Sequence, residues 1–259
     1  VITLFSPGVS DAEWLISNHP GAQSLRQGRD CEQCHQGQER EMGASLAKRG
    51  QAVSRDIDAS FRVKEEQLHV SLTWQGPVDD KQISIMWGNE GNEPFRRGGC
   101  WAACHNDMPG MSQDRGQQQG KYLWVARSQQ QRIGQPPRLK SSTELSELMS
   151  QGNFVEIWQA TMSSPSEATF RGGTILDQLA WRENSQVKGT VAYAKGRWTV
   201  TFTRPLQGGA GHAKSFLPGK HYTFGVALHG DKLPLQAHWV SLPKTFSLDD
   251  RETDFISAR

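Results

Sequence analysis

The four cysteines of this 259-residue sequence fall into two close pairs, and a histidine follows the second cysteine of each pair. These residues are Cys31, Cys34 and His35 in CEQCH, and Cys100, Cys104 and His105 in CWAACH. Such pairs serve three kinds of chemistry: two disulfides, one four-cysteine zinc site, or two covalent haem attachments. With 8 histidines among 259 residues, chance would place one after both pairs roughly one time in a thousand. The histidines therefore favour haem.

The first pair has the spacing of a c-type haem attachment, in which each thiol adds to a vinyl group and the following imidazole binds the iron. The second pair has one residue more between its cysteines. The thiols need only reach the two vinyl groups, and the neighbouring Gly98, Gly99, Ala102 and Ala103 can permit a bulged backbone. We therefore predict two haem c groups, with a local disulfide or an uncommon metal site as the alternatives at the second pair.

The cysteine motifs and the composition limit the cellular compartment in which we expect the protein and the classes of partner it could bind. Covalent haem attachment needs an assembly apparatus outside the cytoplasm, so we expect a periplasmic protein. The start VITLFSPG lacks the features of a signal peptide, which suggests an exported chain whose signal has been removed. A net charge of +2, with no basic run interleaved with aromatics, argues against nucleic acid as a partner. No apolar run is long enough to cross a bilayer.

Two kinds of periodicity divide the chain. Residues 1–50 are predicted as a small helical haem segment, with Ser10 and Glu13 as a capping box. From residue 51 to 259 the pattern has period two, and many short strands with turn signals predict an antiparallel β-sandwich with CWAACH inserted between two strands. One helix is expected within it, with a capping box of Ser141 and Glu144 and a stop at Gly152. The fold class is therefore mainly β.

Three segments, WTVTFTRPL, HYTFGVALHGD and AHWVSLPKTFSL, resemble the haem-binding sandwich of the ethylbenzene dehydrogenase gamma-subunit family. The resemblance covers most of the chain from about Asp56 and implies an electron-transfer role. Simple members of that family hold a b-type haem between a methionine and a lysine. Here a cysteine pair with His105 is inserted, and His238 takes the place of the lysine. The N-terminal EWLISNHPGAQSLRQGRDCEQCH resembles the added c-type haem segment of a diheme branch.

Two six-coordinate haems need four axial ligands, so each motif histidine requires a partner. His238 shares its expected strand face with Val240 and Leu242, which predicts an apolar interior position and makes it the first candidate for the second haem. The rival is His229, which shares a face with small residues of HYTFGVALH that would leave room for a flat macrocycle. Either could instead be a hydrogen-bonded structural histidine.

For the first haem the candidate is His19, at a helix end shortly before Cys31, and the alternative is a surface histidine. Met86 is held in reserve as a soft axial ligand. Arg96 and Arg97 stand just before the second motif and could pair with haem propionates through forked hydrogen bonds, or form a solvated loop pair.

These residues predict an electron carrier in which single electrons pass between redox partner proteins. The family resemblance implies a molybdenum oxidoreductase or a membrane quinol dehydrogenase as the partner. One alternative is a haem enzyme or a gas or redox sensor, which needs an open axial site. A binding module with structural haem is the other, since a sandwich does not fix function. We see no triad, phosphate loop or paired-carboxylate motif that would supply other catalysis.

Overall fold

The computed structural model of the chain describes residues 1–8, 17–47, 50–104, 122–129, 138–209, 212–230 and 238–258. Several residues singled out by the sequence lie outside these ranges: Ser10, Glu13 and His105. Of Cys104 only the backbone is described. No helix within the described ranges is long and apolar enough to span a membrane.

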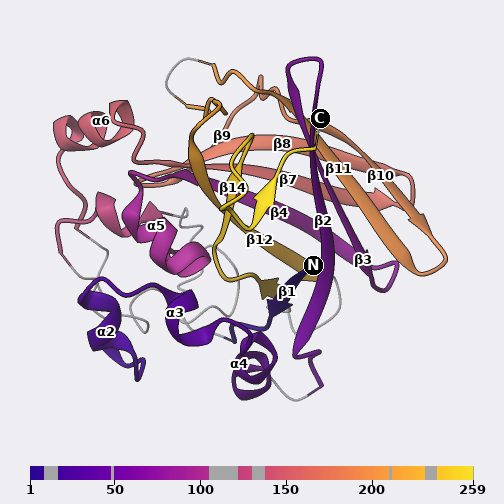
Figure 1. Cartoon of the computed structure of the whole chain (residues 1–259), viewed down its shortest axis with the longest axis horizontal. Helices are drawn as coiled ribbons and strands as arrows, with labels where there is room; N and C mark the ends of the chain where they lie inside the picture. The colour runs from indigo at the N-terminus through magenta and orange to yellow at the C-terminus, as the bar shows by residue number, and fades with distance from the viewer. Residues whose placement is uncertain are drawn as a thin grey trace.

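Antiparallel strands make up most of the fold, as the period-two pattern predicted (Figure 1). The strands are β1 (Ile2–Phe5), β2 (Ser54–Lys64), β3 (Gln67–Gln75), β4 (Asp80–Asn89), β5 (Ala103–Cys104), β6 (Tyr122–Leu123), β7 (Val155–Ser164), β8 (Glu167–Ile175), β9 (Leu179–Trp181), β10 (Lys188–Ala194), β11 (Arg197–Pro205), β12 (His221–Gly230), β13 (His238–Val240), β14 (Lys244–Ser247) and β15 (Phe255–Ile256). All but β5 and β6 join one sheet, in the order β10-β11-β3-β2-β1-β13-β12-β4-β7-β8-β9, with β14 and β15 attached through β12.

This sheet bends so that its two halves face each other across an aromatic core. Phe61 of β2 lies 5.2 Å from Phe224 of β12, measured between ring centroids, and Trp158 of β7 lies 6.2 Å from Phe202 of β11. Burial alternates along strands such as β3, where every second side chain enters the core, because successive side chains of a strand point to opposite faces. The predicted sandwich is therefore confirmed.

The first strand departs from the predicted helical character of residues 1–50. β1 pairs with β2 on one side and with β13 on the other, so it bridges the two halves of the sheet. Its side chains Ile2, Leu4 and Phe5 are buried. A four-residue strand that pairs with segments about 50 and 235 residues away gives no local signal beyond its apolar character.

Short helices gather at one side of the sandwich (Figure 1). They are α2 (Ala22–Arg26), α3 (Cys31–His35), α4 (Glu39–Leu46) and α5 (Glu93–Gly98), followed by the 3₁₀ turns η1 (Gly99–Ala102) and η2 (Trp124–Ala126). α6 (Ser142–Ser150) has the predicted capping box, with the Glu144 N–H donating to Ser141 Oγ at 3.4 Å, and Gly152 follows it at φ +77°.

A second apolar cluster lies between these helices and the outer face of the sheet. It contains Phe5, Met86, Phe95, Cys100 and Leu242, and Cys31 packs against it. α5 approaches β4 closely here, because Gly88 has no side chain and a Cβ at that position would lie 2.7 Å from the Phe95 ring. Both cysteine motifs thus reach the same side of the sandwich.

Candidate haem sites

The first cysteine motif forms the short helix α3. Asp30 precedes it in an extended conformation, and the Asp30 N–H donates to Gln33 Oε1 at 3.2 Å. Within one helical turn the spacings of three and four residues bring Cys31, Cys34 and His35 to the same side. Cys31 and Cys34 are free thiols, so the disulfide considered for this pair is absent.

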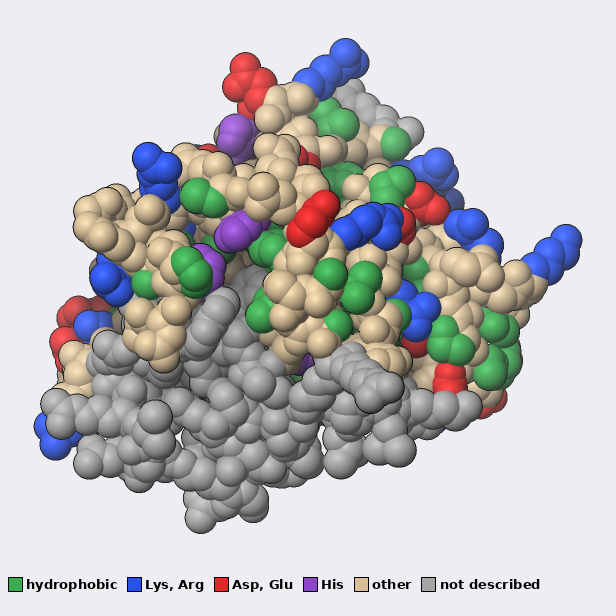
Figure 2. All heavy atoms as spheres, turned by 90° about the horizontal axis from the view of Figure 1, so that it is seen from below, with side chains coloured by type: hydrophobic (Ala, Val, Ile, Leu, Met, Phe, Trp, Pro, Cys, Tyr) green, Lys and Arg blue, Asp and Glu red, His purple; other side chains and the backbone are tan. Residues whose placement is uncertain are grey.

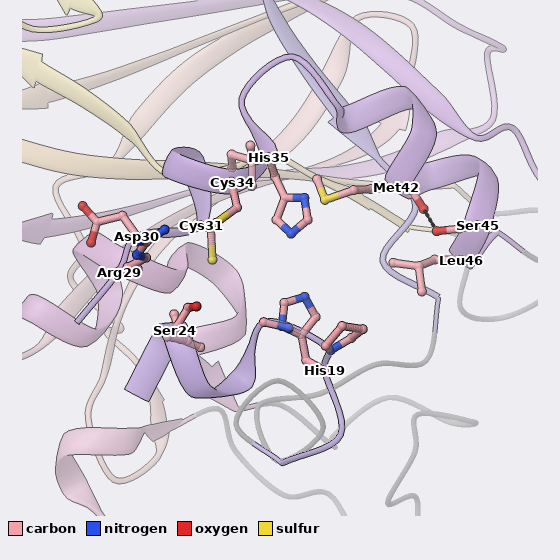
Figure 3. Close-up of a pocket in the computed structure, with 14 residues that line it drawn as sticks. His19, Ser24, Arg29, Asp30, Cys31, Cys34, His35, Met42, Ser45 and Leu46 are labelled. Atoms are coloured by element: carbon pink, nitrogen blue, oxygen red, sulfur yellow. Dashed lines mark hydrogen bonds between the residues drawn. The ribbon is translucent and has the colours of Figure 1, made fainter. Parts of the chain in front are cut away.

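That side of α3 faces a cavity of about 580 Å³ whose walls come from α2, α3 and α4 (Figure 3). It is lined by His19, Pro20, Gly21, Ser24, Leu25, Arg29, Asp30, Cys31, Cys34, His35, Met42, Ser45, Leu46 and Leu242. Cofactor pockets are typically 300–1,000 Å³ and mostly apolar, with a few convergent polar groups, and this cavity has that character. Figure 2 views the molecule from this side and shows histidine side chains near hydrophobic ones at the surface.

Two imidazoles face each other across the cavity. The ring centroids of His19 and His35 are 5.9 Å apart, at an interplanar angle of 61°. Two trans metal–nitrogen bonds of about 2 Å each, plus the ring radius at both ends, separate imidazole centroids by about 6 Å. The pair therefore fits one metal ion held between the rings, with the two thiols beside it as a c-type haem requires.

Hydrogen bonds orient both rings. His35 Nδ1 lies 3.4 Å from Gln38 Oε1, and because that oxygen can only accept, Nδ1 donates and leaves the Nε2 lone pair for a metal. The Gly21 N–H donates to His19 Nδ1 at 3.1 Å, so the proton of a neutral His19 is on Nε2. Binding a metal through Nε2 would require the tautomer with its proton on Nδ1, and that tautomer cannot accept the Gly21 N–H.

Burial sets the protonation of the site. It lowers the pKa of His19, with a further contribution from His35, and so favours the neutral imidazole that a metal needs. Burial also raises the pKa of the Cys31 thiol to about 12, and Asp30 adds to this while Arg97 opposes it. The thiol therefore stays protonated and weakly nucleophilic, as expected where an assembly apparatus drives attachment.

Ion pairs on both sides of Cys31 fix α3 to the sandwich. Asp30 Oδ2 lies 2.7 Å from Arg96 Nη1 of α5, and both side chains are partly buried. Glu32 pairs with Lys244 of β14. Burial raises the pKa of Glu32, and the hydrogen bond from Lys244 opposes that rise.

The second cysteine motif begins on η1, against the outer face of β12. Gly99 connects α5 to η1 at φ +53°, a conformation that L side chains rarely adopt, so a glycine here has a clear backbone role. Cys100 is buried. A Cβ at Gly225 would lie 3.5 Å from Cys100 Sγ, so η1 rests on the strand where β12 has no side chain.

Both candidate distal histidines for this motif lie on that same face. β12 and β13 pair with His229 opposite His238, and the rings stack with centroids 5.4 Å apart and an interplanar angle of 11°. His238 is buried, as predicted. It faces the second apolar cluster, between the sheet and α5, and not the core between the two halves of the sheet. Met86 pairs with Gly225 and belongs to the same cluster, so the reserve ligand is also near.

The two arginines before the second motif bind the first motif's segment. They form the last turn of α5 and are half-buried, so they are not a solvated loop pair. Arg96 is engaged by Asp30, and Arg97 Nη2 donates to the carbonyl of Leu25 in α2. Arg97 Nε is buried and has no hydrogen-bond partner among the described residues. A buried donor of this kind fits an anionic group such as a haem propionate.

Sequence reasoning missed the contribution of α4 to the cavity. Met42 and Leu46, four residues apart, present one face of α4 to the space beside His35 (Figure 3). Their spacing within EREMGASL is the i, i+4 signal of a helix face, which could have pointed to them.

Comparisons with known proteins point in one direction. The model of a family described as ethylbenzene dehydrogenase matches residues 160–239, which run from the middle of β7 into β13. The chain is 27% identical to cytochrome c-552 of Stutzerimonas stutzeri, over 96% of this chain and 84% of that protein. It is 26% identical to cytochrome c-551 of Rhodocyclus tenuis, over 93% of this chain and 88% of that protein.

Among solved structures, a Bacteroides uniformis protein described as a candidate carbohydrate-binding protein aligns over 80% of this chain and 77% of that chain. Its TM-score of 0.37 and 10% identity support no conclusion about function. By sequence, the chain is thus similar to two cytochromes c along most of its length and to the ethylbenzene dehydrogenase family over residues 160–239.

Proposed function

We propose that the protein is a periplasmic diheme c-type cytochrome that carries single electrons between redox partner proteins. The observation that carries the proposal is the pair of facing imidazoles, His19 and His35, 5.9 Å apart beside the thiols of Cys31 and Cys34. The relatives named cytochrome c-552 and c-551, which align with more than nine-tenths of the chain, support it.

At the first site Cys31 and Cys34 would attach a haem covalently, and His35 and His19 would bind its iron. The haem would supply a one-electron couple. Apolar side chains such as Leu25 line the same cavity and would disfavour water beside the iron. Nothing then has to bind at the iron for the protein to work.

At the second site Cys100 and Cys104 would attach the haem, and His105 would bind its iron. His238 would be the second iron ligand, with His229 as the alternative. Support for this choice comes from the contact of Cys100 with Gly225, which lies on the same face of β12 as His229, the direct cross-strand neighbour of His238.

The exposed side of the first cavity offers a place for a partner protein to dock. The first cavity opens at the surface, where Cys34 is exposed, so a docked protein could approach the haem edge there. The family resemblance suggests a molybdenum oxidoreductase or a membrane quinol dehydrogenase as donor or acceptor. Covalent attachment outside the cytoplasm supports the periplasm.

Spectroscopy with an external ligand tests the electron-carrier role. Low-spin spectra for both haems, unchanged when carbon monoxide is added to the reduced protein, are expected if protein ligands fill all axial positions. A high-spin fraction that binds carbon monoxide stoichiometrically would instead support a haem enzyme or a gas sensor with an open axial site, and would contradict the proposal.

A further inference from the structure

The outer face of one half of the sheet carries a pocket that is separate from the candidate haem sites. β2, β3 and β11 are neighbours in the sheet, and a cavity of about 400 Å³ lies over them. The residues that line it are Ser60, Phe61, Arg62, Lys64, His69, Ser71, Thr201 and Ala258. None of these residues lines the cavity beside His19 and His35.

Strand register brings the polar side chains of this pocket together. Every second side chain of β3 enters the core, so His69 and Ser71 point to the opposite face. Ser71 pairs with Ser60 of β2 and with Thr201 of β11. His69 pairs with Arg62 of β2. The strands therefore place hydroxyls in one row and basic side chains in the next.

Positive charge lines the pocket without an opposing carboxylate. The basic residues of its lining are Arg62, Lys64 and His69. Arg62 forms no ion pair or side-chain hydrogen bond with any residue that the structure describes. Lys64 contacts Glu65 at 3.4 Å, but both side chains are exposed, and such pairs contribute little. Asp58, on the same face of β2, is engaged by Arg197 at 3.1 Å. The charge of Arg62 thus remains available to a ligand.

The groups that line the pocket also have hydrogens to donate. Thr201 Oγ1 donates to Ser71 Oγ at 3.1 Å, so the Ser71 hydroxyl keeps its own hydrogen for a ligand. His69 Nδ1 lies 3.1 Å from Thr203 Oγ1, and when that hydroxyl donates, the ring proton is on Nε2. The Arg62 guanidinium offers parallel N–H groups that match two oxygens of one anion. Donors and positive charge in one pocket favour an oxyanion.

We infer that this pocket binds an oxyanion of the phosphate class, with Arg62 as the main contact and Ser71 and His69 as further donors. Donors from side chains on two strands suit the tetrahedral oxygens of phosphate better than a planar carboxylate. Inorganic phosphate and the phosphate headgroup of a lipid share this chemistry. The inference does not depend on how many haems the chain carries.

Titration of the reduced, natively matured protein with inorganic phosphate tests the inference, with chloride holding the ionic strength constant. Amide proton–nitrogen correlation spectra should show saturable shifts at residues 60–64 and 69–71. Arg62→Gln should weaken binding by about tenfold or more, because it removes the charge and the paired donors. Ser71→Ala, which keeps the charge, should weaken binding by a smaller factor and serves if R62Q does not mature.

Lys195→Asn is the matched control. It removes one positive charge from the turn between β10 and β11, outside the pocket, where the φ of +52° suits asparagine. Its affinity for phosphate should stay within about twofold of wild type. The absence of saturable shifts, shifts confined to other residues, or equal losses in R62Q and K195N would overturn the inference.

Vesicles distinguish the two sources of phosphate. Phosphatidylcholine vesicles with and without phosphatidic acid are sedimented with the wild-type protein and with R62Q. Sedimentation that needs both phosphatidic acid and Arg62 would support a lipid headgroup as the ligand. Saturable shifts with inorganic phosphate, without sedimentation, would support a free oxyanion.

Discussion

At the scale of single residues, His19 and His35 have the same side-chain chemistry but different supports. His35 sits on α3 and its Nδ1 faces Gln38, whereas His19 precedes α2 and receives a hydrogen bond from the Gly21 amide. His35 is therefore the more firmly oriented ligand, since it lies on the helix that carries the thiols. His19 is the ligand whose removal should affect the iron without affecting attachment.

Replacing His19 by alanine should leave the first haem covalently bound but open one axial position. The thioethers to Cys31 and Cys34 do not depend on His19, so intact mass should not change beyond the substitution. The absorption spectrum of the oxidised protein should gain a high-spin component from about one haem in two. His69→Ala is the matched control. His69 lies on β3, does not line the cavity of His19, and has its Nδ1 3.1 Å from Thr203 Oγ1. An unchanged low-spin spectrum in H19A would remove His19 from the ligand set.

The buried Lys214 gives a prediction of how stability depends on pH. Its Nζ donates to the Gly152 carbonyl at 2.7 Å, just beyond α6, and lies 3.7 Å from the centre of the Phe154 ring. Burial lowers its pKa to about 7, and Glu156 opposes this. Between pH 7 and about 10.5 the unfolded chain therefore binds more protons at this lysine than the folded chain does, so stability rises with pH in that window.

Urea unfolding at pH 7 and pH 9.5 measures this effect. The free energy of unfolding of the wild-type protein should increase over that interval by an amount on the order of a few kcal/mol, and Lys214→Met should lose the increase. Lys220 is exposed and lines another cavity together with Lys214, so Lys220→Met is the matched control and should retain the increase. Equal pH slopes for wild type and K214M would show that the burial of this amine has little energetic consequence.

At the scale of elements, the sequence predicts where strands lie along the chain better than it predicts which strands pair in the sheet. Alternation located β2 and β3, and the capping box of Ser141 and Glu144 located α6, because both signals are local. The bridging role of β1 was not predictable, since it depends on pairing with β13 far along the chain.

At the candidate sites, too, local features were predictable from the sequence and long-range contacts were not. The motif spacing located the thiols. Side-chain alternation grouped His238 with Val240 and Leu242 but predicted an interior position, whereas this face is the outer one, which packs under α5. That these two histidines are direct cross-strand neighbours depends on the register of β12 with β13, which no local pattern fixes. The contact of Arg97 with Leu25 joins residues 72 positions apart and could be found only in the fold.

The outer face of β12 gives a prediction at this scale. At Gly225 a Cβ would make ordinary contact with Cys100 Sγ at 3.5 Å and Ser241 Oγ at 3.8 Å, so Gly225→Ala should be tolerated. Gly225→Leu would project into the space between β12 and η1, at about 1–3 kcal/mol of overpacking. Intact mass should show that G225L loses the second haem and keeps the first. Full second-haem content in G225L would mean that this face is not the second site.

At the scale of the whole molecule, the sandwich is a rigid support with two sites on one side. Its core holds the fully buried Trp74, Trp87, Trp158 and Trp198, which pack as an aromatic layer behind the strands that carry the second site. The first site is formed by three short helices and lies at the surface. Under the proposed diheme function this arrangement would suit electron transfer, because one haem would meet a partner while the other would be held against the scaffold.

Counting covalent haems per chain tests the central claim most directly. The natively matured protein is measured by intact mass under denaturing conditions together with the pyridine haemochrome spectrum. We predict two haem c groups per chain, one lost when Cys31 and Cys34 are both replaced by alanine and the other lost when Cys100 and Cys104 are. One covalent haem in the unaltered protein, insensitive to replacement of Cys100 and Cys104, would contradict the diheme account.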